Sequence, residues 1–281
     1  MRVADYDSIA SKYDRRYDLH EYAGVRETLI GFLASGSPAA VLEVGCGTGH
    51  WLAAAEARLK PAPHEPGALD PSAKASADRS ARASAERPVL AGVEPAARML
   101  ARARAAAPGA RLARARAEAL PWRDATFDRI YCVNALHHFA DRARFFAEAR
   151  RILKPGGGLL TIGRDPHTER DAWWVYDYFP ETLDIDRQRV ARVRTLRGEM
   201  ALAGFAWTES FEADRIEALM PATDALTKGV VDRAYTSQLT VLSSAELDAG
   251  IARIVKANAA AGGELQLATD FRLYATVGWV A

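Results

Sequence analysis

Apolar residues change their spacing along the chain in a way that predicts alternating helices and strands. Near the N-terminus they recur every three or four positions, as at Tyr6, Ile9 and Tyr13, and this spacing predicts helices over the first 35 residues. The glycine, serine and proline residues at 35–38 then interrupt the pattern. The short apolar run 39–44 reads as a strand, and after it apolar side chains fall again on one helical face.

The same alternation continues through the rest of the chain. Strands are expected over 88–93, 111–115, 127–133 and 158–162, with helices over 95–107 and 142–153 between them. Further on, the pattern predicts helices over 171–186, 190–203, 218–231 and 245–260 and strands over 205–211 and 265–280. Because two-residue hairpin turns are missing, we expect a parallel sheet with helices on both faces. The predicted fold class is therefore α/β, a doubly wound and mostly parallel sheet of seven strands.

One segment departs from this alternation. Residues 61–88 are rich in proline, alanine, serine and arginine and contain almost no apolar side chain larger than alanine. Such a segment buries too little surface to offset its conformational entropy, so it is expected to be a flexible loop insertion, with a short alanine-rich helix near 73–87 as the alternative. We thus divide the chain into a helical cap at 1–36, a core at 37–163, and at 164–281 the rest of the sheet with helical insertions.

Composition excludes several classes of protein. The 281 residues are 49% hydrophobic and 26% charged, and 37 Lys and Arg against 36 Asp and Glu give a net charge of +1. This balance gives no reason to expect a nucleic-acid partner. No run of 18 apolar residues predicts a membrane span, and the two cysteines fit a reducing compartment. We expect a cytoplasmic enzyme, and an oligomer is not indicated.

The sharpest chemical signal is the glycine-rich sequence that follows the first strand. Leu42-Glu43-Val44-Gly45-Cys46-Gly47-Thr48-Gly49 joins that strand to a helix, so that backbone amides and the helix N-terminus would face a ligand. Glu94 follows the second strand, at the position where a carboxylate would hold a ribose diol. The two features predict a cofactor that contains a nucleoside.

The spacing of the glycines narrows the choice of cofactor. A dinucleotide fingerprint has its last glycine three residues after the second, whereas here His50 occupies that position. The spacing instead resembles the first motif of the class I S-adenosylmethionine-dependent methyltransferases, in their small-molecule branch. The resemblance extends from about Tyr6 to Ile162 and includes the segment Asn134-Ala135-Leu136-His137-His138-Phe139 and the turn that begins at Arg150.

The resemblance implies a set of residues around S-adenosylmethionine. The glycines would line its methionine and ribose, Glu43 would hold its ammonium group, and Glu94 would accept from both ribose hydroxyls. Near the adenine the family often has an acid where this chain has Arg116, and Ala117 and Glu118 are expected to substitute for it. The implied cofactor-binding residues are Tyr13, Glu43, Gly45, Cys46, Gly47, Gly49, Glu94, Pro95, Ala117, Glu118 and Asn134. The resemblance also implies a Rossmann-like methyltransferase fold whose last strand is antiparallel.

Two histidines are the candidate catalytic residues. His137 is expected to face the methyl donor as a general base or a positioning contact, while His138 is as well explained by packing. No ligand cluster supports a metal at either residue. The aromatic stretch 173–179 is either core or a lid over the acceptor, and Arg233, Tyr235 and Gln238 are candidate acceptor contacts.

These features predict transfer of a methyl group from S-adenosylmethionine to a small-molecule acceptor. A sulfonium donor needs positioning more than covalent catalysis, and the sequence shows a cofactor motif without a catalytic triad. The alternatives are an NAD(P)-dependent oxidoreductase on a similar fold and a relative that binds the cofactor without catalysis.

Overall fold

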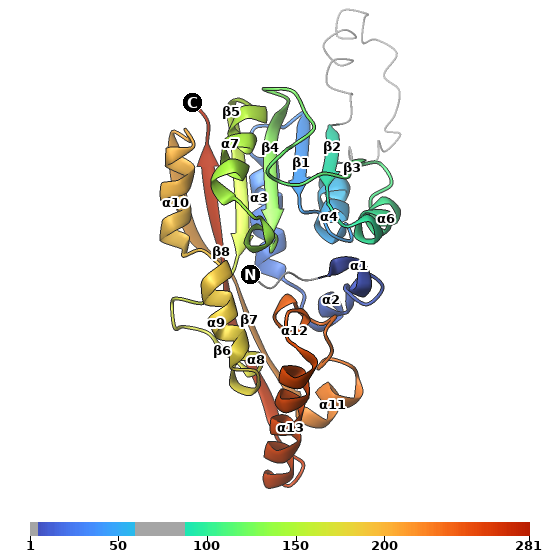
Figure 1. The fold of residues 1–281 in the computed structure, drawn as a ribbon. Helices are drawn as coiled ribbons and strands as arrows, with labels where there is room; N and C mark the ends of the chain where they lie inside the picture. Colours follow the sequence, from blue (N-terminus) through green and yellow to red (C-terminus); the bar gives the residue numbers. More distant parts are fainter. Residues whose placement is uncertain (1–4, 60–87) are drawn as a thin grey trace, which may run out of the picture.

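The chain forms one α/β unit in a computed structural model that describes residues 5–59 and 88–281 (Figure 1). The predicted loop insertion at 61–88 and its helical alternative lie outside the described residues, except for Pro88. The three-part division of the chain stays a prediction.

The described residues contain eight strands in one mixed sheet, in the order β3-β2-β1-β4-β5-β8-β6, with β7 paired to β8 beside this path. The strands are β1 (Ala40–Val44), β2 (Val89–Val93), β3 (Arg111–Ala113), β4 (Phe127–Val133), β5 (Leu153–Gly163), β6 (Ala172–Trp173), β7 (Trp207–Pro221) and β8 (Gln266–Trp279). The first five run parallel, and β8 is antiparallel to β5, β6 and β7. The mostly parallel sheet and the antiparallel last strand are confirmed, and β6 is an additional short strand.

Helices cover both faces of this sheet, as the alternation predicted. The helices are α1 (Tyr6–Ile9), α2 (Arg15–Leu19), α3 (Ala23–Ala34), α4 (His50–Leu59), α6 (Ala97–Ala106), η1 (Leu136–His138), α7 (Arg142–Ile152), α8 (Trp174–Tyr178), α9 (Glu181–Arg189), α10 (Val193–Leu202), α11 (Ala222–Thr227), α12 (Ser237–Thr240) and α13 (Ser244–Ala260). Val41 of β1 packs in one core with side chains of α3, α4 and α6, while Leu42 and Val44 pack in a second core with α7 and α10. The sheet is therefore doubly wound.

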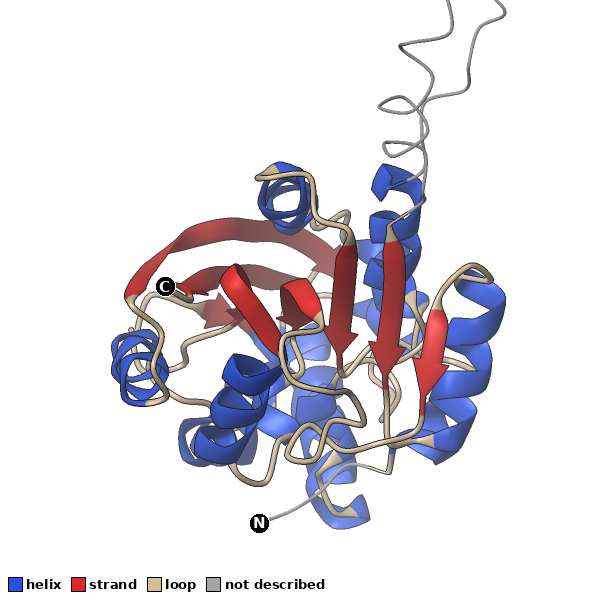
Figure 2. Cartoon of the chain, turned by 90° about the horizontal axis from the view of Figure 1, so that it is seen from above, coloured by secondary structure: helices blue, strands red, loops and turns tan. Residues whose placement is uncertain are grey.

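The C-terminal half differs from the prediction in the length of its strands. Strand β7 was expected to end at 211, with a helix over 218–231, but the strand continues to Pro221 and only Ala222–Thr227 is helical. Apolar Ala218, Leu219 and Met220 suggested a helix, yet they pair with β8 as a strand. The two strands form a long curved ribbon, with a register shift between Glu212 and Asp214 (Figure 2).

The expected helix over 171–186 is also wrong in its detail. Two residues of β6 come first, and the helical part is divided into α8 and α9 at Phe179 and Pro180. A proline has no N–H to donate to the preceding turn and is tolerated only near a helix start, which is where Pro180 lies.

Two helical glycines provide a matched test of this packing. A Cβ on Gly250 in α13 would overlap the ring of Phe179, which is completely buried, whereas a Cβ on Gly198 in α10 would meet nothing within 4 Å. We expect Gly250→Ala to lower the free energy of unfolding by about 1–3 kcal/mol because the ring must move. Gly198→Ala should raise it by up to about 1 kcal/mol through helix propensity. Urea unfolding of both variants checks this, and an increase for Gly250→Ala would contradict the packing.

Candidate functional site

The glycine turn after β1 fits closely between two neighbouring segments. The amides of Gly45 and Cys46 donate to the carbonyl of Val93 at 2.8 and 3.0 Å, which holds the turn against the end of β2. Gly45 has a φ of +75°, and a Cβ there would lie 2.6 Å from the Cβ of Ala135. Gly47 also has a positive φ. A Cβ on Gly47 would point into open space, and the nearest atom to it would be in the Tyr13 ring, 3.9 Å away. Both glycines are thus required by the backbone conformation.

Gly49 has a different role from the one expected. It was placed among the cofactor contacts, but a Cβ on Gly49 would lie 2.8 Å from the Cα of Ala103 in α6. The residue therefore allows α4 to approach α6 closely, and it does not line the cavity described below.

Glu43 lies inside the sheet at the end of β1. Its side chain is buried, and its Oε2 accepts a hydrogen bond from the Tyr131 hydroxyl at 3.1 Å. Burial raises the pKa of the Glu43 carboxyl well above its ordinary range, because desolvation disfavours the charged form. A cationic group that approached this carboxylate would be stabilised by it and would favour its ionised form.

Glu94 is the second buried carboxylate, at the end of β2. Its Oε2 accepts from the Gly47 amide at 3.1 Å, and its Oε1 accepts from the Ala96 amide at 2.9 Å. Burial raises the pKa of this carboxyl, while the two backbone hydrogen bonds lower it. The amides fix the orientation of Glu94 and leave each oxygen with a further lone pair for a ligand.

A cavity of about 350 Å³ lies between these two carboxylates. It is at the carboxyl ends of β1, β2 and β4, where the strand order reverses and ligands bind in open α/β sheets. Of the residues expected from the sequence, the cavity lining contains Tyr13, Glu43, Gly45, Cys46, Gly47, Glu94, Pro95, Ala117, Glu118, Asn134 and His138. Gly49 and His137 are the two expected residues that the lining does not include.

Glu118 lies at one end of the cavity, and its carboxylate is hydrogen-bonded to protein groups. Its Oε1 accepts from the amides of Ala140 and Asp141 at 2.6 and 3.3 Å, at the start of α7, and Arg116 lies 3.5 Å from its Oε2. The Glu118 side chain thus fixes the position of the segment that begins at Ala115, whose residues line this end of the cavity.

The N-terminal helices lie against the mouth of the cavity. Asp14 accepts from the Thr48 hydroxyl and from Arg102, the latter at 2.7 Å, and Asp7 accepts from the Arg98 amide at 2.7 Å. These contacts join α1 and α2 to the glycine turn and to α6 (Figure 1). The cap therefore forms part of the cavity wall.

The cap also contributes five residues that sequence reasoning did not place in the site: Asp5, Tyr6, Asp7, Arg16 and Tyr17. The Arg16 guanidinium lies over the Tyr13 ring at 3.7 Å, and Tyr17 stacks on His50 with ring centroids 3.6 Å apart. The helical spacing of the tyrosines was visible in the sequence, but it did not show which face would be turned to the cavity.

A second, smaller cavity of about 60 Å³ adjoins the first. The two share Tyr6, Tyr13, Arg16, Asn134 and His138, so these residues lie between them. The smaller cavity is also lined by His137, by Trp173 from the aromatic stretch, and by Tyr235 and Gln238 of the loop region that was a candidate for acceptor contacts. Trp173 also fits the other expectation for the aromatic stretch, that of a core side chain, because Trp173 is only 4% exposed.

The two histidines have exchanged the positions expected for them. His138 lines both cavities and its Nε2 lies 2.5 Å from the Tyr6 hydroxyl, while His137 lines only the smaller of the two. The Nε2 of His137 is buried without a hydrogen-bond partner. Burial lowers the pKa of both imidazoles well below the ordinary value, so both rings are neutral and each can accept a hydrogen bond.

Asn134, between the two cavities, has an unusual backbone. It follows β4 with a φ of +51°, and its amide donates to the carbonyl of Ile162 at 2.7 Å. Asparagine tolerates this left-handed conformation better than most residues, which directs the chain into η1 and places both histidines beside the cavities.

Residues 5–59 and 88–281 contain neither a metal-binding cluster nor a membrane-spanning helix. No group of three or more His, Cys, Asp or Glu side chains there could hold a metal ion. None of the helices in that part of the chain is long and apolar enough to cross a membrane.

Comparison with known proteins gives the following similarities. Residues 79–161 match a family model described as a methyltransferase domain. Over 91 residues the chain is 37% identical to phthiotriol/phenolphthiotriol dimycocerosates methyltransferase 1 of Mycobacterium ulcerans, a match that covers 32% of this chain and 33% of that protein. Over 40 residues it is 45% identical to 27-O-demethylrifamycin SV methyltransferase of Amycolatopsis mediterranei, a match that covers 14% of this chain and 15% of that protein. The matches thus span about a third or less of these relatives.

The fold as a whole is similar to that of a solved structure. A SAM-dependent methyltransferase from Thermotoga maritima, described as a possible histamine N-methyltransferase, superimposes with a TM-score of 0.56 at 18% identity, covering 98% of each chain. The chain therefore has the fold of this methyltransferase, and residues 79–161 within it match the methyltransferase domain.

Proposed function

We propose that this chain transfers a methyl group from S-adenosylmethionine to a small organic acceptor. The observation that carries the proposal is the pair of adjoining cavities, one between Glu43 and Glu94 and one beside His137, which meet at Asn134 and His138. A methyl donor and its acceptor must be held in neighbouring spaces that open to each other, because the reacting atoms have to come into line.

The larger cavity has the chemistry that S-adenosylmethionine requires. Its volume falls within the range of small-ligand sites, and Gly45 and Gly47 leave backbone space that a Cβ would occupy. Glu43 would hold the ammonium group and Glu94 the ribose hydroxyls. Arg16, whose buried Nε has no hydrogen-bond partner among the described residues, would take the carboxylate of the methionine part.

When bound, S-adenosylmethionine supplies an electrophilic methyl group on a sulfonium. The residues of the chain orient the two partners, and this alone can contribute on the order of 7–11 kcal/mol to lowering the barrier. Helices α1 and α2 form part of the wall of the site. The neutral His137 Nε2 is buried with no other partner, so it can accept a hydrogen bond from an acceptor hydroxyl and orient it.

The acceptor is proposed to be a small molecule. The two curated relatives reported above are named for compounds of this kind. In this chain most residues that line only the smaller cavity come from after residue 163, as Arg164, Trp173, Tyr235 and Phe271 do. The division of the chain into a donor-binding core at 37–163 and an acceptor-binding part at 164–281 is supported by this distribution.

Binding of the donor should release a proton from the protein. Burial raises the pKa of the Glu43 carboxyl and so favours its protonated form in the free protein, and an ammonium group beside it would lower that pKa again. We expect S-adenosylhomocysteine, which keeps the ammonium group, to bind more tightly as the pH rises. Calorimetry in buffers of different ionisation enthalpy measures the proton release, which Glu43→Gln should abolish. Release that persists in this variant would come from another group.

The proposed function is tested by ligand binding and by turnover. We expect S-adenosylhomocysteine to bind and NADH not to bind, because His50 stands where a dinucleotide site has its third glycine. Transfer of a labelled methyl group from S-adenosylmethionine to any compound of an acceptor library would exclude a relative that only binds the cofactor. Binding of NADH without S-adenosylhomocysteine would overturn the proposal in favour of an oxidoreductase.

A further inference from the structure

We propose that the acceptor carries a carboxylate and that Arg164 binds it. This inference rests on the proposed function, since it takes the smaller cavity as the acceptor site. Arg164 comes directly after β5 and lines the smaller cavity but not the larger one. It therefore belongs to the acceptor side of the site.

The Arg164 guanidinium is held by an ion pair, while two of its nitrogen atoms have no hydrogen-bond partner. Its Nη2 donates to Asp171 Oδ2 at 2.8 Å, and the two side chains are 11% and 6% exposed. Its Nε and Nη1 are buried with no hydrogen-bond partner. Unpaired donors of a buried cation are costly, so their persistence indicates that a ligand completes them.

Aromatic rings restrict the directions from which a ligand can reach Arg164. The rings of Trp173, Tyr176 and Phe271 have centroids 4.3, 5.0 and 4.5 Å from the guanidinium carbon. Rings at these distances interact with the face of a guanidinium, whereas its N–H bonds lie in its plane. This arrangement fits a planar hydrogen-bond acceptor that lies between the aromatic rings and meets the edge of the guanidinium. A carboxylate is the planar anion that arginine recognises best.

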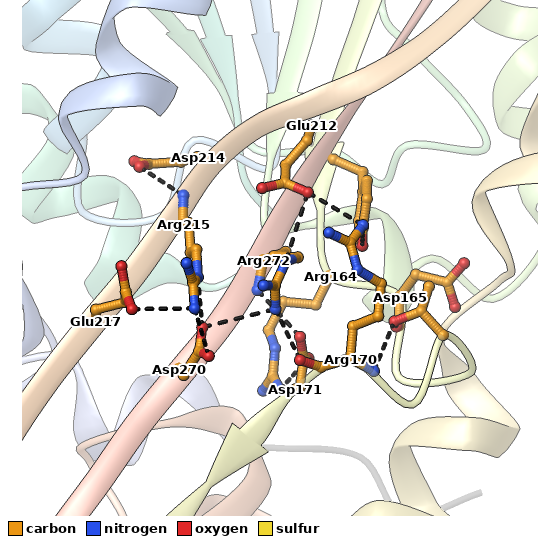
Figure 3. A network of polar contacts seen from close by, with 12 residues as sticks. Arg164, Asp165, Arg170, Asp171, Glu212, Asp214, Arg215, Glu217, Asp270 and Arg272 are labelled. Atoms are coloured by element: carbon orange, nitrogen blue, oxygen red, sulfur yellow. Dashed lines mark hydrogen bonds and ion pairs between the residues drawn. The ribbon is translucent and has the colours of Figure 1, made fainter.

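The position of Arg164 is fixed from outside the cavity. Asp171 also accepts from the Arg272 amide at 3.0 Å, and Arg272 donates to the Arg170 carbonyl at 2.7 Å. Figure 3 shows this network of ion pairs, which joins the segment after β5 to strands β7 and β8. A guanidinium held by such a network loses little further entropy when a ligand binds, which favours a role in recognition.

The other charged residues of the cavity wall do not compete for the anion. Asp186 is 1% exposed, and its oxygens accept from Tyr176, Arg189 and Gln238 at 2.7–2.8 Å. The charge of Asp186 is therefore compensated by Arg189, and both histidines are neutral. Arg16, between the two cavities, was assigned above to the donor.

The test compares each acid with its amide, which has nearly the same shape and no charge. The probes are salicylate with salicylamide and glycolate with glycolamide, each titrated into protein saturated with S-adenosylhomocysteine and followed by calorimetry and tryptophan fluorescence. In at least one pair we expect the acid to bind about ten-fold or more tightly than the amide, and Arg164→Gln to remove this preference. Arg170→Gln, in the same network but half-exposed and outside both cavities, is the matched control and should keep it.

The outcomes separate this inference from the proposed function. No preference for the acid in either pair, or a preference that survives Arg164→Gln, overturns the inference while S-adenosylhomocysteine binding still stands. Loss of S-adenosylhomocysteine binding in the unmodified protein overturns the proposed function itself. Should Arg164→Gln not fold, Asp171→Asn replaces it. That variant leaves Arg164 with an unshared charge, so the preference for the acid should rise several-fold, and an unchanged preference would overturn the inference.

Discussion

Replacing Glu94 with alanine is expected to weaken the binding of S-adenosylhomocysteine by about 1–3 kcal/mol, or roughly five-fold to more than a hundred-fold. Two effects act in the same direction. The ribose hydroxyls would lose a charged acceptor, and the amides of Gly47 and Ala96, which now donate to Glu94 at 3.1 and 2.9 Å, would lose their partner. Calorimetry at fixed pH measures the change, and thermal unfolding of the same variant shows whether it remains folded.

Glu94→Gln separates the two effects. A glutamine keeps the size of the side chain and one carbonyl oxygen, but its NH₂ group cannot accept from a backbone amide. We expect it to weaken binding less than alanine does. Glu217→Gln, a change at an exposed residue of β7 that lies outside the cavities, should leave the affinity unchanged. Unchanged affinity in Glu94→Ala would show that the ribose is not held at this carboxylate.

The part of the site that the sequence predicts is the part made by local geometry. The residues from Glu43 to Gly47 form a strand and a turn whose positive φ angles only glycine adopts easily, so they can be recognised from spacing alone. Glu94 follows from the same logic, because the ends of adjacent parallel strands meet at one edge. The doubly wound sheet was predictable for the same reason, since each element shows its type within about ten residues.

The part that the sequence does not predict depends on contacts between distant elements. Gly49 has the spacing of a ligand-binding glycine, but Ala103 of α6 decides its role. Arg16 and Tyr6 reach the cavity because Asp14 and Asp7 fix the cap on the glycine turn and on α6. Likewise, residues 218–220 have the composition of a helix and become a strand because β8 offers a partner along its whole length. In each case tertiary contacts override the local pattern.

Replacing Asp186 with leucine is expected to lower the free energy of unfolding by about 3–5 kcal/mol. Its ion pair with Arg189 has an N–O distance of 2.8 Å, and the two side chains are 2% and 3% exposed. Removal of the carboxylate leaves the buried Arg189 charge uncompensated and also takes a partner from Tyr176 and Gln238. Urea unfolding measures the loss. Arg189→Met should cost a similar amount for the same reason.

The double variant with both changes decides whether the cost arises from the broken pair. Because removing both charges leaves none unpaired, the double variant should be clearly more stable than the sum of the two single effects predicts. Additive effects would mean that the two side chains contribute separately. Asp186 lines the smaller cavity and not the larger one, so S-adenosylhomocysteine should bind the double variant with unchanged affinity. A loss of that affinity would show that the wall formed by α9 and α12 also shapes the donor site, and that the two cavities do not act as separate sites.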